Sequence, residues 1–381
     1  MEYIFIVGAV QAFFLTFLVI SKENKSKGDY VMMTWFVLLG ILLTAYSLEV
    51  LGIDDQYPIF WGFTTSLPML VGPITLLYVL AYTKKDQRIS PLFALNALPY
   101  LIFTVIVFIK MTTESESTVR ENITLIEDAQ EPIFFLFELC RIFLGPIYLI
   151  ISLFLLRKHT DRIGRYFSYT ENINLKWIRN VILMLIFIWV TVIIISILSN
   201  WNDFIPWRLG DNLIYLMVTI TVFINGYYGI RQQIIFSSFP SKTSPATPLT
   251  QSGNNKSQYL NSGLTEKESK AHLENLLKFM KDEQPYLDGK LSLAQVAESM
   301  DISTNHLSQV INENLNRNFF DFINGYRVEL VKQKMLDSAN SNLTLLGMAY
   351  DSGFNSKSSF NSIFKKSTGM TPSQYLQSQS A

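Results

Sequence analysis

Long apolar runs dominate the first 235 residues. A helix that crosses a bilayer needs about 20 mostly apolar residues. Seven stretches are long enough: 3–20, 30–50, 57–82, 91–109, 132–156, 181–199 and 212–230. Buried helices of soluble proteins rarely occur as a series of such runs, so the pattern predicts a seven-helix transmembrane bundle and not a large soluble all-α core.

Basic residues are distributed unevenly between the connections of these runs. The odd-numbered connections contain twelve Lys and Arg residues, whereas the even-numbered ones contain three, Lys110, Arg120 and Arg208. Short cytoplasmic loops carry an excess of Lys and Arg. The N-terminus is therefore expected outside, and everything after the seventh run is expected in the cytoplasm.

The composition changes after residue 235. Residues 236–263 are rich in Ser, Thr, Pro, Asn and Gln, and Pro240, Pro245 and Pro248 interrupt any helical pattern. Such a segment behaves as a flexible tether. We therefore expect three regions: a membrane domain (1–235), a flexible linker (236–263) and a soluble domain (264–381).

The soluble region has a helical pattern that occurs twice. The first unit is an apolar-periodic helix at 292–300, a short turn, and a second helix at 304–315. About 52 residues later, 344–352 and 356–367 repeat it around the turn Gly353-Phe354-Asn355. Each unit has the form of a helix-turn-helix. Between them, 319–336 predicts one helix about 27 Å long, which could hold two recognition helices about one DNA turn (34 Å) apart.

Charged residues within the apolar runs are candidates for function, because charges are costly in a bilayer. Glu138 and Arg141 share one face of the fifth run, and Glu49 lies near the outer end of the second. Two interpretations stay open at this stage. The pair either holds the bundle together or belongs to a pocket for a signal ligand.

The composition excludes several kinds of chemistry. The chain is 49% apolar and 16% charged, with one cysteine, Cys140, and three scattered histidines. This rules out an intrachain disulfide framework and makes a Cys- or His-based metal site improbable. No Walker A motif, glycine-rich nucleotide loop or nucleophile motif is present. We expect no catalytic residues and no cofactor.

Five short motifs stand out in the soluble region. They are 353–360 (GFNSKSSF), 364–366 (FKK) and 369–375 (GMTPSQY), with 307–311 (LSQVI) and 319–327 (FFDFINGYR) upstream. Together they closely resemble the C-terminal signature of AraC-type transcription regulators. The resemblance covers roughly residues 266–381 and implies binding to double-stranded DNA. The apolar half looks like the membrane-embedded variant of the family. Two departures are Asn316-Arg317-Asn318 in place of a glycine, and recognition helices without arginine.

Polar side chains on the two recognition helices are the candidate DNA contacts. On the first helix they should point away from the Leu307 and Ile311 core, and Asn and Gln can bond adenine in a bidentate way. The resemblance places Asn305 and Gln309 at base-contacting positions. Lys365, Lys366 and Arg327 are interpreted as phosphate contacts or solvated charges. The full set is Asn305, Ser308, Gln309, Asn312, Lys357, Ser358, Asn361, Ser362, Lys365 and Arg327.

Together these patterns predict an all-α, multi-pass regulator in a bacterial cytoplasmic membrane. It would couple an unknown signal ligand to transcription, work as a homodimer on promoter DNA, and have RNA polymerase as a candidate partner. Proteolytic release of 237–381 is a rival mechanism. The alternative function is a seven-span transporter or receptor whose cytoplasmic helical domain is an interaction module.

Overall fold

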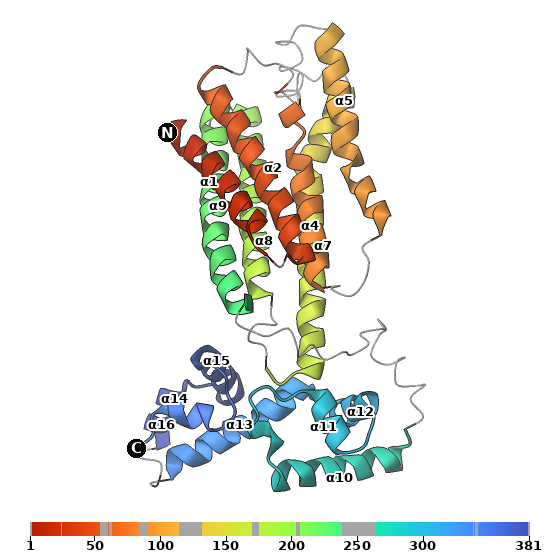
Figure 1. Cartoon of the computed structure of the whole chain (residues 1–381), viewed down its shortest axis with the longest axis vertical. Coiled ribbons are helices and arrows are strands. Elements are labelled where there is room, and N and C mark those ends of the chain that lie inside the picture. The colour runs from red at the N-terminus through yellow and green to blue at the C-terminus, as the bar shows by residue number, and fades with distance from the viewer. Residues whose placement is uncertain are drawn as a thin grey trace. The chain divides into compact units, whose positions relative to one another are not determined.

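The computed structural model describes residues 2–23, 25–53, 60, 63–83, 90–113, 132–169, 175–202, 206–237, 264–337, 339 and 342–379. Most of these residues are in helices, and within them no strand forms. The chain divides into two compact units (Figure 1). Unit 1 comprises 1–157 and 175–240, and unit 2 comprises 158–174 and 241–381. The expected linker, 236–263, lies almost wholly outside the described residues.

Unit 1 is built from long apolar helices. Six helical segments of the described chain are long and apolar enough to cross a membrane, and α4 is a shorter apolar helix of 16 residues. Within the third expected run, 57–82, the helix α4 thus begins only at Pro68. The helices are α1 (Glu2–Ile20), α2 (Lys27–Val50), α4 (Pro68–Thr83), α5 (Leu98–Thr113, preceded by a 3-10 helix Pro91–Ala97), α7 (Pro132–Tyr166), α8 (Lys176–Asn202) and α9 (Trp207–Ser237).

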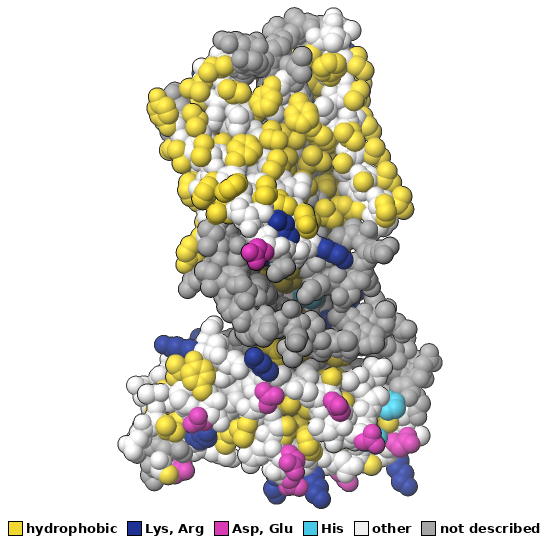
Figure 2. Space-filling model, viewed as in Figure 1, with side chains coloured by type: hydrophobic (Ala, Val, Ile, Leu, Met, Phe, Trp, Pro, Cys, Tyr) yellow, Lys and Arg dark blue, Asp and Glu magenta, His cyan; other side chains and the backbone are white. Residues whose placement is uncertain are grey.

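The surface of unit 1 is apolar. Figure 2 shows hydrophobic side chains spread over its visible face. Phe154 is 67% exposed and Phe187 is 65% exposed, and many other large apolar side chains on these helices are also exposed. Monomeric soluble proteins rarely expose apolar patches larger than about 300–600 Å². The outer surface of these helices is therefore suited to contact with lipid and not with water.

Several hydroxyl groups inside unit 1 bond to the backbone of their own helices. Thr16 donates to the carbonyl of Ala12 at 3.0 Å, and Thr75 donates to that of Val71 at 2.7 Å. Without water, every buried donor needs a protein acceptor. Close helix contacts occur at small residues: a Cβ on Gly40 would lie 2.8 Å from the ring of Phe13.

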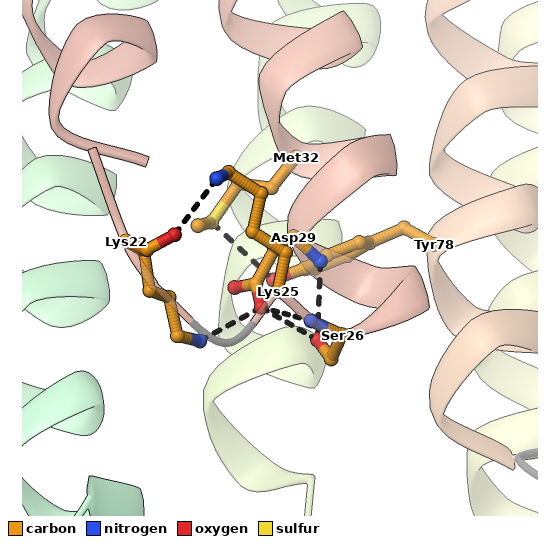
Figure 3. Close-up of polar contacts among 6 residues, drawn as sticks. All are labelled: Lys22, Lys25, Ser26, Asp29, Met32 and Tyr78. Carbon is orange, nitrogen blue, oxygen red and sulfur yellow. Dashed lines mark hydrogen bonds and ion pairs between the residues drawn. The ribbon is translucent and has the colours of Figure 1, made fainter. Parts of the chain in front are cut away.

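A polar cluster closes the connection between α1 and α2 (Figure 3). Asp29 is 3% exposed, and its carboxylate accepts from the Lys22 ammonium at 2.7 Å. The same carboxylate accepts from the amide and the hydroxyl of Ser26, at 2.6 and 2.8 Å. Ser26 caps α2 in return, as in a capping box. The cluster fixes the start of α2.

Unit 2 contains helices at the positions expected for two helix-turn-helix units. The predicted helices are present with small shifts at their ends, and each of α10–α15 begins at a Ser, Thr or Asn cap. The elements are α10 (Glu266–Asp282), a 3-10 turn (Pro285–Leu287), α11 (Leu293–Ser299), α12 (Thr304–Leu315), α13 (Phe319–Leu336), α14 (Leu345–Tyr350), α15 (Lys357–Thr368) and α16 (Pro372–Gln379).

Helix α13 is shared by two separate cores. Its first half contributes Phe319, Phe322 and Ile323 to a core with α10, α11 and α12. Its second half contributes Val328 and Val331 to a core with α14 and α15. Figure 1 shows α13 running from the α11–α12 pair to the α14–α16 group. This helix therefore joins the two helix-turn-helix units.

The aromatic core of the second unit gives a first prediction. Phe360 is 2% exposed, and its ring lies 5.3 Å from that of Phe354 and 5.6 Å from that of Phe364. Truncating a buried Phe costs about 3–5 kcal/mol. We expect Phe360→Ala to raise hydrogen exchange throughout α14–α16 in the full-length protein. Met370→Ala, at an exposed position, is the control, and equal exchange in both variants would contradict this packing.

Candidate nucleic-acid interface

The turn of the second helix-turn-helix unit requires a glycine. Gly353 has φ +90°, in the left-handed region that side chains rarely adopt. A Cβ at this position would collide with the carbonyl oxygen of Tyr286 and lie 3.0 Å from Nε of Arg327. Asn355, two residues on, donates from its side-chain amide to the carbonyl of Gly289. The turn is thus packed against the segment 285–291.

Helix α15 presents the predicted polar residues outward. Lys357, Ser358, Asn361, Ser362 and Lys365 are exposed, on the side opposite the buried rings of Phe360 and Phe364. Lys366 is also exposed, but its ammonium bonds to the carboxylate of Asp321 on α13 at 2.8 Å. The expected outward placement on this helix agrees with the structure. What these side chains bind stays a prediction.

Helix α12 differs from the expectation at one of its four candidates. Asn305 is exposed, and Ser308 and Asn312 are half-buried. Gln309 is 5% exposed, and its amide nitrogen donates to both carboxylate oxygens of Glu313, at 3.2 and 3.1 Å. The expectation that Gln309 points into solvent is wrong. Its Oε1 is buried and accepts no hydrogen bond from the described residues.

The expectation that Arg327 is a phosphate contact or a solvated charge is also wrong. Its side chain is 1% exposed, so it is neither a solvated charge nor an accessible phosphate contact. A guanidinium has five N–H donors in a planar fork, and each has an acceptor here. Nε donates to the Tyr286 carbonyl at 2.8 Å, and Nη1 to the Ser168 carbonyl at 3.0 Å and to Oδ1 of Asn324 at 3.1 Å. Nη2 donates to Oγ of Ser168 at 3.1 Å and to the Asp288 carbonyl at 2.7 Å.

Two stacked tyrosine rings lie beside the buried Arg327 side chain. The rings of Tyr286 and Tyr326 stack at 5.2 Å with an angle of 15° between them. Burial raises the pKa of the Tyr286 hydroxyl, and burial together with Tyr286 raises the pKa of Tyr326, opposed by the Arg317 charge. Both hydroxyls are therefore neutral near pH 7. The Tyr286 side chain anchors the backbone carbonyl to which Arg327 bonds.

The residues after α7 form part of unit 2, which the sequence did not indicate. The Ser168 amide donates to the Leu291 carbonyl at 3.1 Å, and its hydroxyl donates to the same carbonyl at 2.7 Å. Phe167 and Ser292 form an antiparallel β-bridge. Asn324 donates to the Ser168 carbonyl at 2.9 Å. No local pattern predicts these contacts, since their partners are more than 120 residues away.

A second group of candidates lies in unit 1. Arg141 donates from Nη2 and Nε to one carboxylate oxygen of Glu138, at 2.8 and 3.0 Å. Glu138 is 2% exposed, and its other oxygen is buried without a partner in the described chain. The predicted pairing is therefore present. Glu49 is half-buried on α2 and does not take part in this ion pair.

Around the ion pair, further polar groups connect α2, α7 and α9. The Tyr46 hydroxyl donates to Oδ1 of Asn212 at 2.9 Å, and its ring stacks on Tyr215 at 3.8 Å. The charge of Asp211 acts on both Arg141 and Tyr215, and that of Glu49 acts on Tyr215. Glu49, Arg141 and Asp211 therefore all lie near Tyr215.

Unit 1 also contains a small cavity away from these charges. It measures about 30 Å³ and is bordered by α2, α4, α8 and α9, through residues that include Trp35, Tyr78, Trp177 and Asn225. A single water needs roughly 10–15 Å³ by this kind of measure, so the cavity has room for about two or three waters. Among the described residues, no group of three His, Cys, Asp or Glu side chains could hold a metal ion.

Arg327 gives a prediction that separates structure from DNA contact. Arg327→Ala leaves several buried carbonyls without donors, at a cost of about 1–3 kcal/mol each. We expect faster hydrogen exchange in α11–α13 of the full-length protein without DNA. Lys365→Ala is the control and should leave exchange unchanged. An Arg327 variant that exchanges like wild type, but binds DNA with a smaller salt dependence, would restore the phosphate-contact role.

The ion pair on α7 gives another prediction. Arg141→Leu leaves the Glu138 carboxylate in the bundle without its partner, which is strongly destabilising or forces protonation. We expect reduced accumulation of the single variant in membranes and recovery in the double variant Glu138→Leu, Arg141→Leu, measured by quantitative blotting. Wild-type accumulation of the single variant would show that the pair contributes nothing.

Comparisons with known proteins agree with the geometry of unit 2. A helix-turn-helix domain model matches residues 296–378. Uncharacterized HTH-type transcriptional regulators of Staphylococcus aureus strains COL, MSSA476 and N315 are 38% identical over 85 residues, which are 22% of this chain and 11% of each relative. This chain therefore matches only a small part of these relatives. No solved structure matches it. Residues 296–378 carry a helix-turn-helix domain related to those of transcriptional regulators.

Proposed function

We propose that this protein is a membrane-bound, sequence-specific transcription regulator of the AraC type. Unit 2 binds promoter DNA, and unit 1 holds it at the membrane and relays a signal. The observation that carries the proposal is the repeated helix-turn-helix on one shared helix, α13, with polar recognition residues exposed on α15. The matched regulators support the DNA-binding half of the proposal.

The membrane half of the proposal rests on unit 1. Its long apolar helices have apolar outer faces and internal hydroxyls bonded to their own backbones. The excess of Lys and Arg in the odd-numbered connections supports seven spans with the N-terminus outside. Residues 158–169 pack with the helix-turn-helix domain, which supports a cytoplasmic position for both. Glu49, Glu138 and Arg141 are the proposed sensing group, and the signal ligand is unidentified.

DNA recognition would divide between bases and phosphates. Asn305, Ser308 and Asn312 on α12, and Lys357, Ser358, Asn361 and Ser362 on α15, are the proposed contacts to base edges. Lys365 is the proposed phosphate contact, while Gln309 and Arg327 act inside the domain. Residues 266–381 contain 12 basic and 13 acidic residues, a net charge of −1. Non-specific binding depends on basic charge, so a single copy should bind weakly.

This weak charge favours a homodimer as the working form. Two copies held in one membrane present two domains at a high effective concentration, which can raise avidity by about 10²–10⁴. Binding two half-sites would then compensate for the missing arginines. RNA polymerase is the proposed partner in activation. A transporter or receptor with a helical interaction module remains the competing function, and it predicts no DNA selectivity.

The test is selection of DNA by the full-length protein in lipid nanodiscs. From a random pool, we expect enrichment of a site with two recognisable halves. Lys357→Ala and Asn361→Ala should each weaken binding to that site by about 1–3 kcal/mol, the value of a good base contact. Their exposed positions imply unchanged folding.

Lys267→Ala is the matched control for charge, because Lys267 is exposed on α10. It should bind the selected site like wild type. Failure to enrich any sequence, with the protein folded in nanodiscs, would refute DNA recognition and favour the interaction module. Equal binding by wild type and by both α15 variants would refute the proposed recognition surface alone.

A further inference from the structure

The helix-turn-helix domain is completed by a segment from between two apolar helices. Residues 163–169, here called the docking segment, include the end of α7 and belong to unit 2. Ile163 is 6% exposed and Ser168 is 1% exposed. The Tyr166 ring packs against the core of α10–α13. The burial of these residues shows that this is a built interface and not an incidental surface contact.

The hydrogen bonds of Ser168 are directed at two different parts of the domain. Its amide and hydroxyl bond to the Leu291 carbonyl, just before α11, at 3.1 and 2.7 Å. Its carbonyl accepts from Asn324 and Arg327 on α13, at 2.9 and 3.0 Å. One residue of the docking segment therefore links the start of the first helix-turn-helix unit to the shared helix.

The two helix-turn-helix units meet around Arg327, one of the residues that bond to Ser168. Arg327 bonds to the Tyr286 and Asp288 carbonyls of the first unit. The Gly353 turn of the second unit packs on the Tyr286 carbonyl and on Nε of Arg327. A shift of Ser168 would remove two of the five acceptors of Arg327 and disturb both neighbours. The docking segment is thus placed to set the relative position of the two DNA-reading units.

The docking segment is also continuous with unit 1. Helix α7 runs unbroken from Pro132 to Tyr166, so it contains both the Glu138–Arg141 pair and the start of the docking segment. A helix transmits rotation and translation along its length better than a flexible linker does. A signal that displaces α7 therefore has a direct mechanical route to Ser168, in addition to the covalent connection through 238–263.

We propose that the docking segment is the transmission contact between the membrane domain and the DNA-binding domain, with Leu291, Asn324 and Arg327 as its receptor surface. The proposal rests on the proposed function. When the segment is docked, the two helix-turn-helix units are held in one geometry. When it is displaced, Arg327 loses two acceptors and the two units are free to change their spacing.

Disulfide trapping tests the contact in native membranes. Phe167 and Ser292 are opposite each other in an antiparallel bridge, where Cα atoms lie about 4.5–5.5 Å apart, within disulfide range. The variant F167C–S292C is made in a Cys140→Ala background, with a protease site placed in 245–255. After mild oxidation and cleavage, we expect the two fragments to remain joined on a non-reducing gel. The pair F167C–K281C, for which the structure shows no contact, is the control.

The proposal would be overturned if the fraction of joined fragments were no greater than that of the control pair. If the cysteine variants do not fold, hydrogen exchange of the wild-type protein decides instead. The Ser168 amide should then be protected as strongly as those of α13, and rapid exchange there would overturn the contact.

DNA binding by the trapped protein tests the transmission. The Kd for the selected two-half site is measured in nanodiscs before and after reduction. Allosteric couplings typically change affinity by about 5- to 150-fold, and we expect a change in that range. Because coupling is reciprocal, the DNA should also change the extent of trapping. Trapping without any effect on Kd overturns transmission, whereas trapping with no DNA binding in either state rejects the proposed function and leaves the contact intact.

Discussion

The packing of unit 2 depends on the hydrogen bonds that the buried guanidinium of Arg327 donates. The acceptors are backbone carbonyls and polar side chains from three segments that are far apart in the sequence. Burying a charge without partners is very costly, so the segments 163–169, 285–291 and 319–336 must all be in place together. The packing of α13, the Gly353 turn and the docking segment follows from this requirement.

Local sequence patterns predict the helices of unit 2 well, because each helix has its own cap residue and its own periodic apolar residues. The cap residues Ser292, Ser303, Asn318 and Ser356 begin helices where the sequence suggested. Phe360 and Phe364 are four residues apart, a spacing that places both on one face of a helix, and both are buried. The outward residues of α15 follow from the same spacing. Periodicity is sufficient where a helix has one buried face against its nearest neighbours.

The errors occurred where burial comes from distant segments. Arg327 shares one face of α13 with Ile323 and Val331. Nothing within the helix shows that Tyr286, Asp288 and Ser168 would cover a charged side chain there. Gln309 was assigned to solvent from the helical position alone, although it is buried and bonded to Glu313. The extension of α7 to Tyr166 could not be predicted from hydropathy, which ends with the apolar residues near 156. In contrast, Glu138 and Arg141 were correctly paired, because their three-residue spacing is local.

The shared helix α13 sets the rotation and the spacing of the α11–α12 pair relative to the α14–α15 pair. Ile323 belongs to the core of the first unit and Val328 to that of the second, so only a few residues separate the two sets of contacts. Each residue of an α-helix turns the chain by about 100° and advances it by about 1.5 Å. A single insertion between these positions would rotate α15 by about 100° relative to α12. Under the proposed function, the length of α13 therefore determines which spacing of half-sites the protein can bind.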